Sequence, residues 1–435
     1  MSPQLTVQTP LQIPPSEIPS YLDQLWSHDE SSNKGANTFS LIVWQPAWME
    51  QKLINNKMIE GPIIGNQRFE IIEAARKVVL EKNLPHSTPP LDNSVALSLS
   101  NTSYKQKTQD LRGQYIDTAI SALQPRRLIT LAPTIDKGTE LETLVAAYCP
   151  LPEEGGGNSA CGDVVVLRGY LDSLKKSLGI LEDLVPEEFP SWLWWNGQLD
   201  EAPELLNQLA TPNRRLVIDS ALGDSKRCLE FLKEKLELGQ AVNDLNWLRL
   251  RNWRETLAMV FDPIHRRSSL NNVINLDIDI EGNHPVQGLL LSAWIADRLE
   301  WQLTHCHSTE NNCIEARFNR PDKKIVTLRL VSLPVGKPSI HPGQIVGLRV
   351  ICKPEKDPQK AICVILASES GECMRLEAGG MASMELVEEV VPNQIHSVEK
   401  DVARLLSSSR GNSSPLLASA TPLAAQLLDL SQTPH

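Results

Sequence analysis

The sequence predicts an α/β protein in two parts. The first is an N-terminal, mostly parallel, Rossmann-like sheet with helices on both faces, and the second is a C-terminal α+β domain with an antiparallel meander. Two patterns support this prediction. Up to residue 268, short apolar strand segments alternate with segments of helical period, as they do in parallel sheets. After residue 269, closely spaced segments with turn residues between them follow one another. A chain of 435 residues is long enough for two or three domains.

We expect four regions along the chain. Residues 1–35 are rich in Pro and Ser and predict a mobile N-terminal arm with one short helix. Residues 36–268 form the α/β domain, and residues 269–392 form the α+β domain. Residues 393–435 predict a helix and a disordered Ser-rich tail, in which 416–430 could form a weak amphipathic helix.

The elements of the α/β domain follow from local period. Apolar runs bounded by turn residues predict strands at 39–44, 126–133, 141–150, 162–169, 189–197 and 214–221. Apolar residues at helical spacing predict helices at 68–83, 113–125, 173–185, 204–210, 225–239 and 245–263.

The α+β domain begins with a strand at 273–282 and a long amphipathic helix at 286–303. The strands of the meander are then expected at 314–320, 324–333, 345–353, 361–369 and 372–380.

The stretch SWLWWNG (191–197) holds three tryptophans within four residues. In a strand, Trp192 and Trp194 share one face, while Leu193 and Trp195 share the other. Both faces are then large and apolar, as a central strand requires when helices cover both sides of its sheet. We interpret the stretch as buried core, with an exposed contact site for a partner as the alternative.

Polar residues follow two of the predicted strands. Asn196 comes directly after the tryptophan strand, and Asp219 and Ser220 end the next strand. Together with Thr134 they could line a crevice at the carboxyl edge of the sheet, where open α/β sheets bind ligands. The other interpretation is that Asp219, Ser220 or Asp224 caps a helix. The crevice would suit an enzyme or a sensor of sugar phosphates or nucleotides.

Composition excludes several classes of protein. A net charge of −11 argues against a nucleic-acid partner. No apolar run approaches the roughly 20 residues of a membrane helix, and residues 1–19 lack the pattern of a signal peptide, so we expect a cytoplasmic protein. The Gly-rich stretch 153–162 lacks the Lys-Ser/Thr pair of a phosphate loop, and no dinucleotide fingerprint is present. No cofactor is therefore expected.

One segment has the residue types of a metal site. His305, Cys306, His307 and Cys313 lie close together in the chain and could in principle hold zinc. Adjacent side chains diverge, however, and no second pair of cysteines two residues apart is present. We therefore expect a polar loop after the long helix, and no metal.

Three further cysteines lie on successive predicted strands. If residues 354–360 form a turn, Cys352 and Cys363 stand roughly opposite each other, and Cys373 follows the next turn. Buried free thiols and a reversible disulfide are both compatible with this spacing.

Several strings together are more specific. DLNWLRLRNWRE (244–255), with SWLWWNG, RRLVIDSA, QPRRLITL and LLLSAWIADRLEWQL, resembles the glucose-6-phosphate dehydrogenase assembly protein family, OpcA, over roughly residues 38–390. The cysteines and the long N-terminal arm resemble its cyanobacterial branch. The resemblance implies a non-enzymatic effector of the oxidative pentose phosphate pathway, which binds glucose-6-phosphate dehydrogenase and raises its activity.

The resemblance also implies redox control, with thioredoxin setting the oxidation state of cysteine thiols. It assigns this role to Cys363 and Cys373, with Cys352 and the pair Cys306 and Cys313 as alternatives.

The string DLNWLRLRNWRE is also a candidate contact with the dehydrogenase, because Trp and Arg are typical of interface hot spots. Its two tryptophans stand about 240° apart on a continuous helix, so one of them is expected in the core. The arginines could instead form internal ion pairs. The candidate contact residues are Trp247, Arg249, Arg251, Trp253 and Arg254.

Overall fold

The computed structural model forms two compact units. It describes residues 5–7, 11–26, 37–44, 125–133, 140–150, 162–185, 189–309, 313–334, 343–354, 361–369, 373–380, 387–392, 398–407 and 413–432. Unit 1 holds the described residues up to Asp219, with 240–243 and 398–407, and unit 2 holds the others. The helix predicted at 68–83 lies outside the described residues, as does the helix predicted at 113–125 apart from its last residue.

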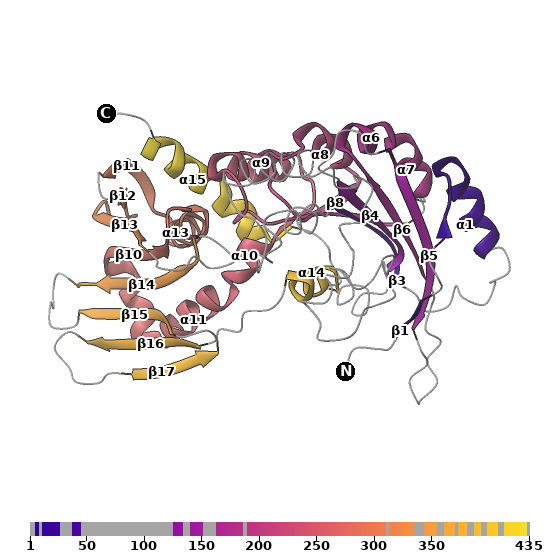
Figure 1. The fold of residues 1–435 in the computed structure, drawn as a ribbon. Coiled ribbons are helices and arrows are strands. Elements are labelled where there is room, and N and C mark those ends of the chain that lie inside the picture. The colour runs from indigo at the N-terminus through magenta and orange to yellow at the C-terminus, as the bar shows by residue number, and fades with distance from the viewer. Residues whose placement is uncertain are drawn as a thin grey trace. The chain divides into compact units, whose positions relative to one another are not determined.

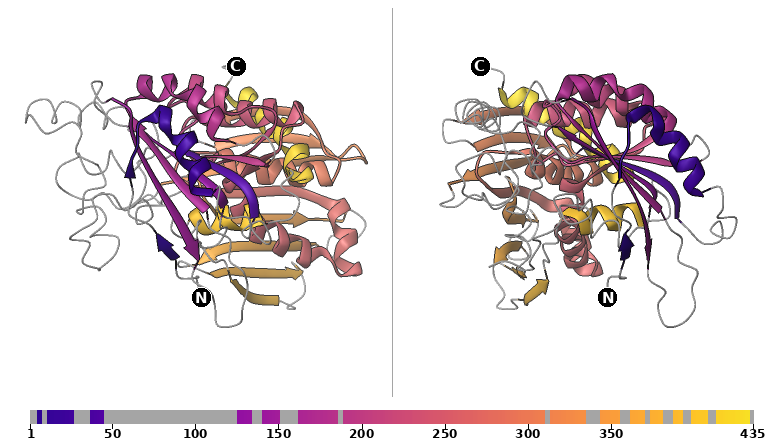
Figure 2. Two further views of the ribbon diagram at one scale, coloured as in Figure 1. Left: turned by 90° about the vertical axis from the view of Figure 1, so that its right-hand side faces the viewer. Right: turned by 45° about the vertical axis from the view of Figure 1, so that its right-hand side comes forward.

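Unit 1 is built on a nine-stranded sheet in the order β1-β5-β6-β4-β3-β7-β8-β9, with β2 also pairing with β5. Figure 2 shows the twist of these strands, drawn in indigo to magenta. The strands are β1 (Leu5–Val7), β2 (Leu11–Gln12), β3 (Asn37–Trp44), β4 (Pro125–Pro133), β5 (Glu142–Pro150), β6 (Gly162–Gly169), β7 (Ser191–Trp195), β8 (Arg214–Ile218) and β9 (Val242–Asp244).

The centre of this sheet is parallel, as predicted. Strand β3 pairs in parallel with β4 and β7, while β4 pairs with β6 and β7 with β8 in the same sense. Among the strand pairs recorded in register, the antiparallel ones are those of β5 with β1, β2 and β6. Strand β7 is the tryptophan strand, and all five of its residues are buried. Its interpretation as core is therefore confirmed.

The helices of unit 1 are short. They are α1 (Ile18–Trp26), α6 (Leu171–Lys176), α7 (Leu178–Leu184), α8 (Pro203–Leu209) and α14 (Val398–Ser407), with a 3-10 turn η1 (Pro15–Glu17) before α1. The single helix predicted at 173–185 is two helices, because the backbone leaves helical geometry at Ser177. The short helix expected in the N-terminal arm is present as α1, but the described residues of the arm are packed: β1 and β2 pair with β5, and Ile18 and Leu22 of α1 are buried.

Unit 2 is built on an eight-stranded sheet in the order β11-β12-β13-β10-β14-β15-β16-β17 (Figure 1). Strands β10 and β13 are parallel, and every other neighbouring pair is antiparallel. The predicted meander is therefore interrupted, because β10 inserts between β13 and β14. The strands are β10 (Val273–Glu281), β11 (Gln302–Thr309), β12 (Cys313–Asn319), β13 (Ile325–Leu333), β14 (Ile345–Cys352), β15 (Ile362–Glu369), β16 (Cys373–Gly380) and β17 (Val387–Pro392).

The long helix of this unit is shorter than predicted. Helix α13 spans Val286–Arg298 and not 286–303. Glu300 takes a left-handed backbone with φ of 56°, and the Trp301 amide closes the helix end by donating to the Ala296 carbonyl at 2.9 Å. The chain then turns into β11, so the predicted polar loop after the helix is wrong: His305, Cys306 and His307 lie on a strand.

Helices cover one face of this sheet. Helix α13 packs on β10 and β13, and α15 (Pro415–Gln432) packs on β11, β12 and α13. Gly288 permits the close approach of α13, since a Cβ there would lie 2.5 Å from Leu330. The other helical segments are α9 (Ser225–Glu237), α10 (Leu245–Arg249), α11 (Arg251–Phe261), α12 (Ile264–Arg267) and the 3-10 helix η2 (Ser268–Asn272).

Two expectations about domain limits change. The helix considered at 416–430 is present as α15, but it is a packed element and not part of a disordered tail, because Leu417, Ala420, Ala424, Leu427 and Leu428 are buried along it. The boundary expected at 268/269 also moves. Helix α9 packs against α15 and α13, and α10 packs against α13, so residues 220–239 and 244–268 belong to unit 2. Within the described part of the chain, no helix is long and apolar enough to cross a membrane.

Candidate functional site

Asp244, the first residue of DLNWLRLRNWRE, is a buried hydrogen-bond acceptor. Its side chain is the N-cap of α10 and accepts from the Asn246 and Trp247 amides, each at 3.2 Å. It also accepts from the Ser220 amide at 2.9 Å and from the Ser220 hydroxyl at 2.7 Å. With 1% of its surface exposed, Asp244 joins the start of α10 to Ser220, a residue 24 positions earlier in the chain.

The network continues through two amide side chains to the second sheet. Asn246 donates to the Ser220 hydroxyl at 3.2 Å and accepts from Gln287 of α13 at 2.8 Å. The Gln287 carbonyl oxygen then accepts from the amide of Ile345, the first residue of β14, at 2.8 Å. Because each of these groups is buried, the network fixes α10, α13 and β14 relative to one another.

The tryptophans of this segment are both in the core, whereas only one of them was expected there. Trp247 is 5% exposed and Trp253 is 3% exposed. The segment is not one continuous helix: α10 ends at Arg249 and α11 begins at Arg251, and Leu250 between them, with ψ of −5°, belongs to neither. This break changes the angle between the two residues, so both can point inward.

The arginines of the segment contact neighbouring groups of the chain. The contact of Arg251 is an ion pair of the kind that the alternative interpretation expected, whereas that of Arg254 with Trp247 is not. The Arg254 guanidinium lies 3.7 Å from the ring centre of Trp247, and burial lowers its pKa to about 10. Arg251 is exposed and pairs with Glu255 at 2.7 Å, one turn along α11. Arg249, in the last turn of α10, is half-buried. The surface that this segment offers to a partner is therefore small.

Two of the crevice candidates come together at the carboxyl edge of the first sheet. Asn196 and Asp219 follow the ends of neighbouring parallel strands, two residues beyond the pair Trp194 and Val217. Asp219 is only 3% exposed, and Ser220 is held by Asp244 instead. Thr134 lies outside the described residues. Helix capping is confirmed for Asp224, which accepts from the Arg227 amide at the start of α9.

The cysteines of unit 2 divide between the two faces of its sheet. Cys306 donates to the Leu427 carbonyl of α15 at 3.4 Å, and Cys352 is fully buried. Cys363 and Cys373 are half-buried on the face opposite Cys352, as the pairing of β14, β15 and β16 places them. Cys313 lies beside Glu315 on this same face, which we call the polar face.

The register does not bring the candidate redox pairs together. Cys363 pairs with Gly379, while Cys373 pairs with Glu369 at the other end of the two strands, about 20 Å away at 3.3 Å per residue. Cys352 pairs with Ile362 and not with Cys363, so the expected opposition is wrong by one residue. A shift of one residue sends the two thiols to opposite faces. Cys306 and Cys313 diverge in the same way, since Cys306 pairs with Ala316.

The thiols should differ sharply in reactivity. Burial raises the pKa of Cys306 to about 11 and that of Cys352 to about 12. Burial also raises the pKa of Cys363. Because the thiolate is the reactive form and Cys373 is half-buried, a maleimide at pH 8 should label Cys373 at least about 100-fold faster than Cys306 and Cys352, and Cys363 at an intermediate rate. Mass spectrometry of timed digests measures this order. If Cys306 and Cys352 are labelled as fast in the folded chain as in the chain unfolded by urea, the predicted order is wrong.

The polar face carries charged residues in a row that the sequence-based interpretation missed. Glu315 on β12 pairs in register with Arg329 on β13, Arg329 with Asp277 on β10, and Asp277 with Arg349 on β14. The sign therefore alternates across four strands. Burial and the neighbouring Asp277 raise the pKa of Asp279, which shares this face. The signal that could have revealed it was the charges two residues apart in IEARFNR and LDIDI and the single arginine among apolar residues in TLRLV and GLRVI.

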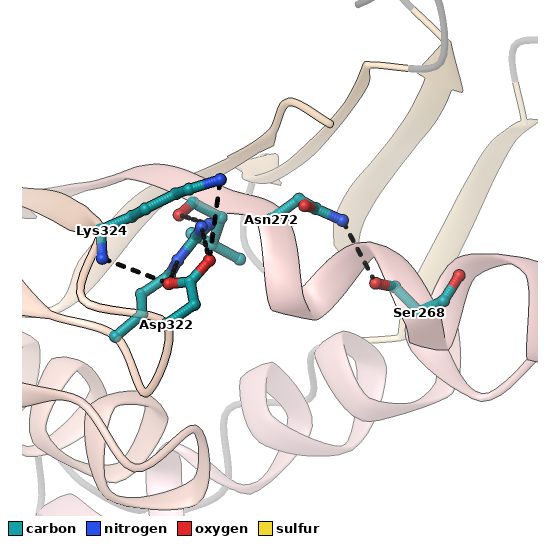
Figure 3. Close-up of polar contacts among 6 residues, drawn as sticks. Ser268, Asn272, Asp322 and Lys324 are labelled. Atoms are coloured by element: carbon teal, nitrogen blue, oxygen red, sulfur yellow. Dashed lines mark hydrogen bonds and ion pairs between the residues drawn. The ribbon is translucent and has the colours of Figure 1, made fainter. Parts of the chain in front are cut away.

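The turn between β12 and β13 is held by a separate set of polar contacts. In Figure 3, Asp322 lies beside Lys324 in this turn, and its side chain accepts from the Lys324 amide at 3.2 Å. Arg320, 5% exposed, pairs with Asp322 and also donates to the Val273 carbonyl at 2.9 Å. The Arg320 hydrogen bond lowers the pKa of Asp322. The same figure shows Asn272 beside Ser268, where the side-chain amide of Asn272 donates to the backbone carbonyl of Ser268. These contacts anchor the turn to the start of β10.

The described residues contain no group of three or more His, Cys, Asp or Glu side chains suited to a metal ion. His305 and His307 share one face of β11, with ring centres 5.1 Å apart, while Cys306 points to the other.

Comparison with known proteins matches almost the whole chain to one family. Residues 117–234 match the family model described as the glucose-6-phosphate dehydrogenase subunit N-terminal domain, and residues 240–421 match the corresponding C-terminal domain. The OxPP cycle protein OpcA of Synechococcus elongatus is 30% identical over 406 residues, which cover 90% of each chain. Its namesake in Synechocystis is 27% identical, over 99% of this chain and 94% of that protein.

Solved structures are less similar. A 3-ketoreductase from Actinomadura kijaniata is 10% identical, covers 57% of this chain and 78% of its own, and gives a TM-score of 0.37. The UDP-N-acetylglucosamine 3-dehydrogenase of Acidithiobacillus ferrooxidans is 7% identical, over 59% of this chain and 85% of that chain, with a TM-score of 0.35. No functional conclusion follows from likenesses this low.

Proposed function

This chain belongs to the OpcA family of glucose-6-phosphate dehydrogenase subunits, and we propose that it is a non-enzymatic activator that binds the dehydrogenase and raises its activity. The observation that carries the proposal is the match of both subunit domains, in order, over residues 117–421. The proposal places this protein in the oxidative pentose phosphate pathway.

The buried polar residues of unit 2 are engaged in structural hydrogen bonds, which supports a binding role. Ser220, Asp244 and Asn246 resemble a catalytic set by residue type, yet each is buried and bonded to the others. Their donors and acceptors are used in the hydrogen bonds that connect α10, α13 and β14. An activator needs no nucleophile and base; it needs a higher affinity for the active state of its partner than for the inactive state.

The chain should lower the substrate concentration at which the dehydrogenase reaches half of its maximal activity. A coupling between activator and substrate typical of allosteric proteins would change this concentration about 5- to 150-fold. Initial rates, measured as the purified chain is titrated into the dehydrogenase with and without reductant, test the effect. A boiled sample of the chain is the control, and an unchanged rate curve under both conditions would contradict the proposal.

We further propose that thiols on the polar face make the activation redox-sensitive. Cys363 and Cys373 are the half-buried thiols of unit 2, whereas Cys306 and Cys352 lie on its covered face. Because their register positions are far apart, each thiol would act singly or after the β15–β16 pairing opens. Reduction by thioredoxin stays a prediction of the family resemblance.

The double variant Cys363→Ser/Cys373→Ser should lose the difference between oxidised and reduced activation, because neither thiol remains to be modified. The matched control is Cys352→Ala on the neighbouring strand, which should keep the difference. The same activation assay measures both. A difference that survives in the double variant would move the role to another cysteine.

A further inference from the structure

The central row of the polar face is made of four charges in register. From β12 to β14 these are Glu315, Arg329, Asp277 and Arg349, which we call the charge row. Two ion pairs join neighbours within it. Arg329 lies 3.4 Å from Glu315, and the Arg349 Nε donates to Asp277 at 2.9 Å. The four strands carry the signs minus, plus, minus and plus in order.

This face lies open among the described residues, in contrast to the face under α13 and α15. On the covered side, Ile278, Leu328 and Leu348 are at most 2% exposed. On the polar face, the side chains of Glu315, Arg329 and Arg349 are 35%, 48% and 49% exposed. A flat face of this kind can take another flat protein surface.

Asp277 is the exception, and it needs a further partner. It is 8% exposed, and its Oδ1 has no hydrogen-bond partner among the described residues. Its other oxygen accepts from Arg349. A buried carboxylate oxygen left without a donor costs free energy, so a donor that arrives from outside the chain would stabilise it.

We propose that this face binds the same face of a second copy of the chain. A two-fold axis that runs parallel to the strands, between β13 and β10, reverses the order of the charge row. Each sign then meets its opposite: Glu315 faces Arg349 of the second copy, and Asp277 faces Arg329 of the second copy. The partner guanidinium supplies the donor that Asp277 Oδ1 lacks.

The charges select this axis over its nearest alternative. An axis through the middle of the sheet, between β10 and β14, would place β12 over β16. Asp277 would then face Arg349, but Glu315 would face Glu377, which stands in the same row through Ile365, so this axis sets like charges against each other at two contacts. Like charges across an interface cost several kcal/mol, which disfavours this arrangement.

The area also fits. The chosen axis overlaps six strands, β11 to β15 with β10, and leaves β16 and β17 outside. Six strands about 4.8 Å apart and about eight residues long span roughly 29 Å by 26 Å, or about 750 Å². Stable interfaces bury about 800 Å² on each partner.

Complementary charge reversal tests the proposal. The full-length wild-type chain, kept reduced, should be a dimer in sedimentation equilibrium at micromolar concentration. Glu315→Arg places two Arg residues against each other at each contact, and Arg349→Glu places two Glu residues there. Each variant alone should raise the dimer Kd about 100-fold or more. Mixed together they should form a heterodimer, because the introduced Arg of one chain meets the introduced Glu of the other.

Arg375→Glu is the matched control. It changes the same residue type in the same way on the same face, but on β16, outside the overlap, so the dimer should persist. Circular dichroism checks that each variant folds. If a reversal unfolds unit 2, Glu315→Gln and Arg349→Gln replace it, and each should raise the dimer Kd about 10-fold.

Two results would overturn the proposal. The first is a wild-type chain that stays monomeric at tens of micromolar; if Arg349→Glu then also loses binding to the dehydrogenase, the face is assigned to that enzyme. The second is a mixture of folded reversal variants that does not pair. The activation assay is repeated with the monomeric variants, so that the loss of the dimer and the loss of activation of the dehydrogenase are measured separately.

Discussion

Replacing Asp244 by alanine should lower the free energy of unfolding by about 3–5 kcal/mol. The side chain accepts from the Ser220 amide and hydroxyl and from the amides of Asn246 and Trp247. All these residues are buried, so water cannot replace the lost acceptor. Each donor left without a partner costs about 1–3 kcal/mol, and α10 also loses its cap.

Urea unfolding of the full chain, followed by circular dichroism, measures the loss. Asp224→Ala is the matched control, because Asp224 is also an N-cap aspartate but accepts only from the exposed start of α9. That variant should lose only about 1 kcal/mol. Equal losses at the two positions would mean that the buried network adds nothing to the cap.

Replacing Trp195 by alanine should cost about 3–5 kcal/mol, as removal of a buried aromatic ring usually does. Trp195 is fully buried and stacks on Trp44 of β3, with ring centres 4.7 Å apart and planes 7° apart. Its indole nitrogen donates to the Gln198 carbonyl at 2.9 Å. The change removes the stack, the hydrogen bond and the packing between two neighbouring strands.

The conservative variant Trp195→Phe keeps a ring in the stack and loses the hydrogen bond, so it should lose about 1–2 kcal/mol. Unfolding in urea, followed by the fluorescence of the other tryptophans, measures both variants. A loss below about 1 kcal/mol for Trp195→Ala, together with lost activation of the dehydrogenase, would instead favour the exposed contact site.

Local patterns predicted those parts of the fold that depend on short stretches of chain. The two apolar faces of Trp192 to Trp195 predicted a buried central strand, and β7 is one. An aspartate before an amphipathic run predicted a cap, and Asp224 caps α9. Both depend on residues within a few positions of each other, so sequence period and side-chain chemistry suffice.

Predictions failed where the backbone turned without a usual signal. The helical period of α13 continues through Leu299 and Trp301, so it hid the end of the helix. That end depends on a left-handed backbone at Glu300, a residue type that rarely adopts it. Likewise, Trp247 and Trp253 were placed on one continuous helix, and the break at Leu250 allows both to be buried.

The sequence by itself determined the family, the parallel character of the first sheet and the identity of twelve of the seventeen described strands, because these follow from motifs and local period. Only the tertiary structure decided what meets across strands. Register separated Cys352 from Cys363 by one residue, and the insertion of β10 brought Asp277 between Arg329 and Arg349. Pairing joins residues far apart in the chain, and a shift of one residue exchanges the two faces of a strand. No local pattern carries that information, so the charge row and the joint at Asp244 emerged only from the folded chain.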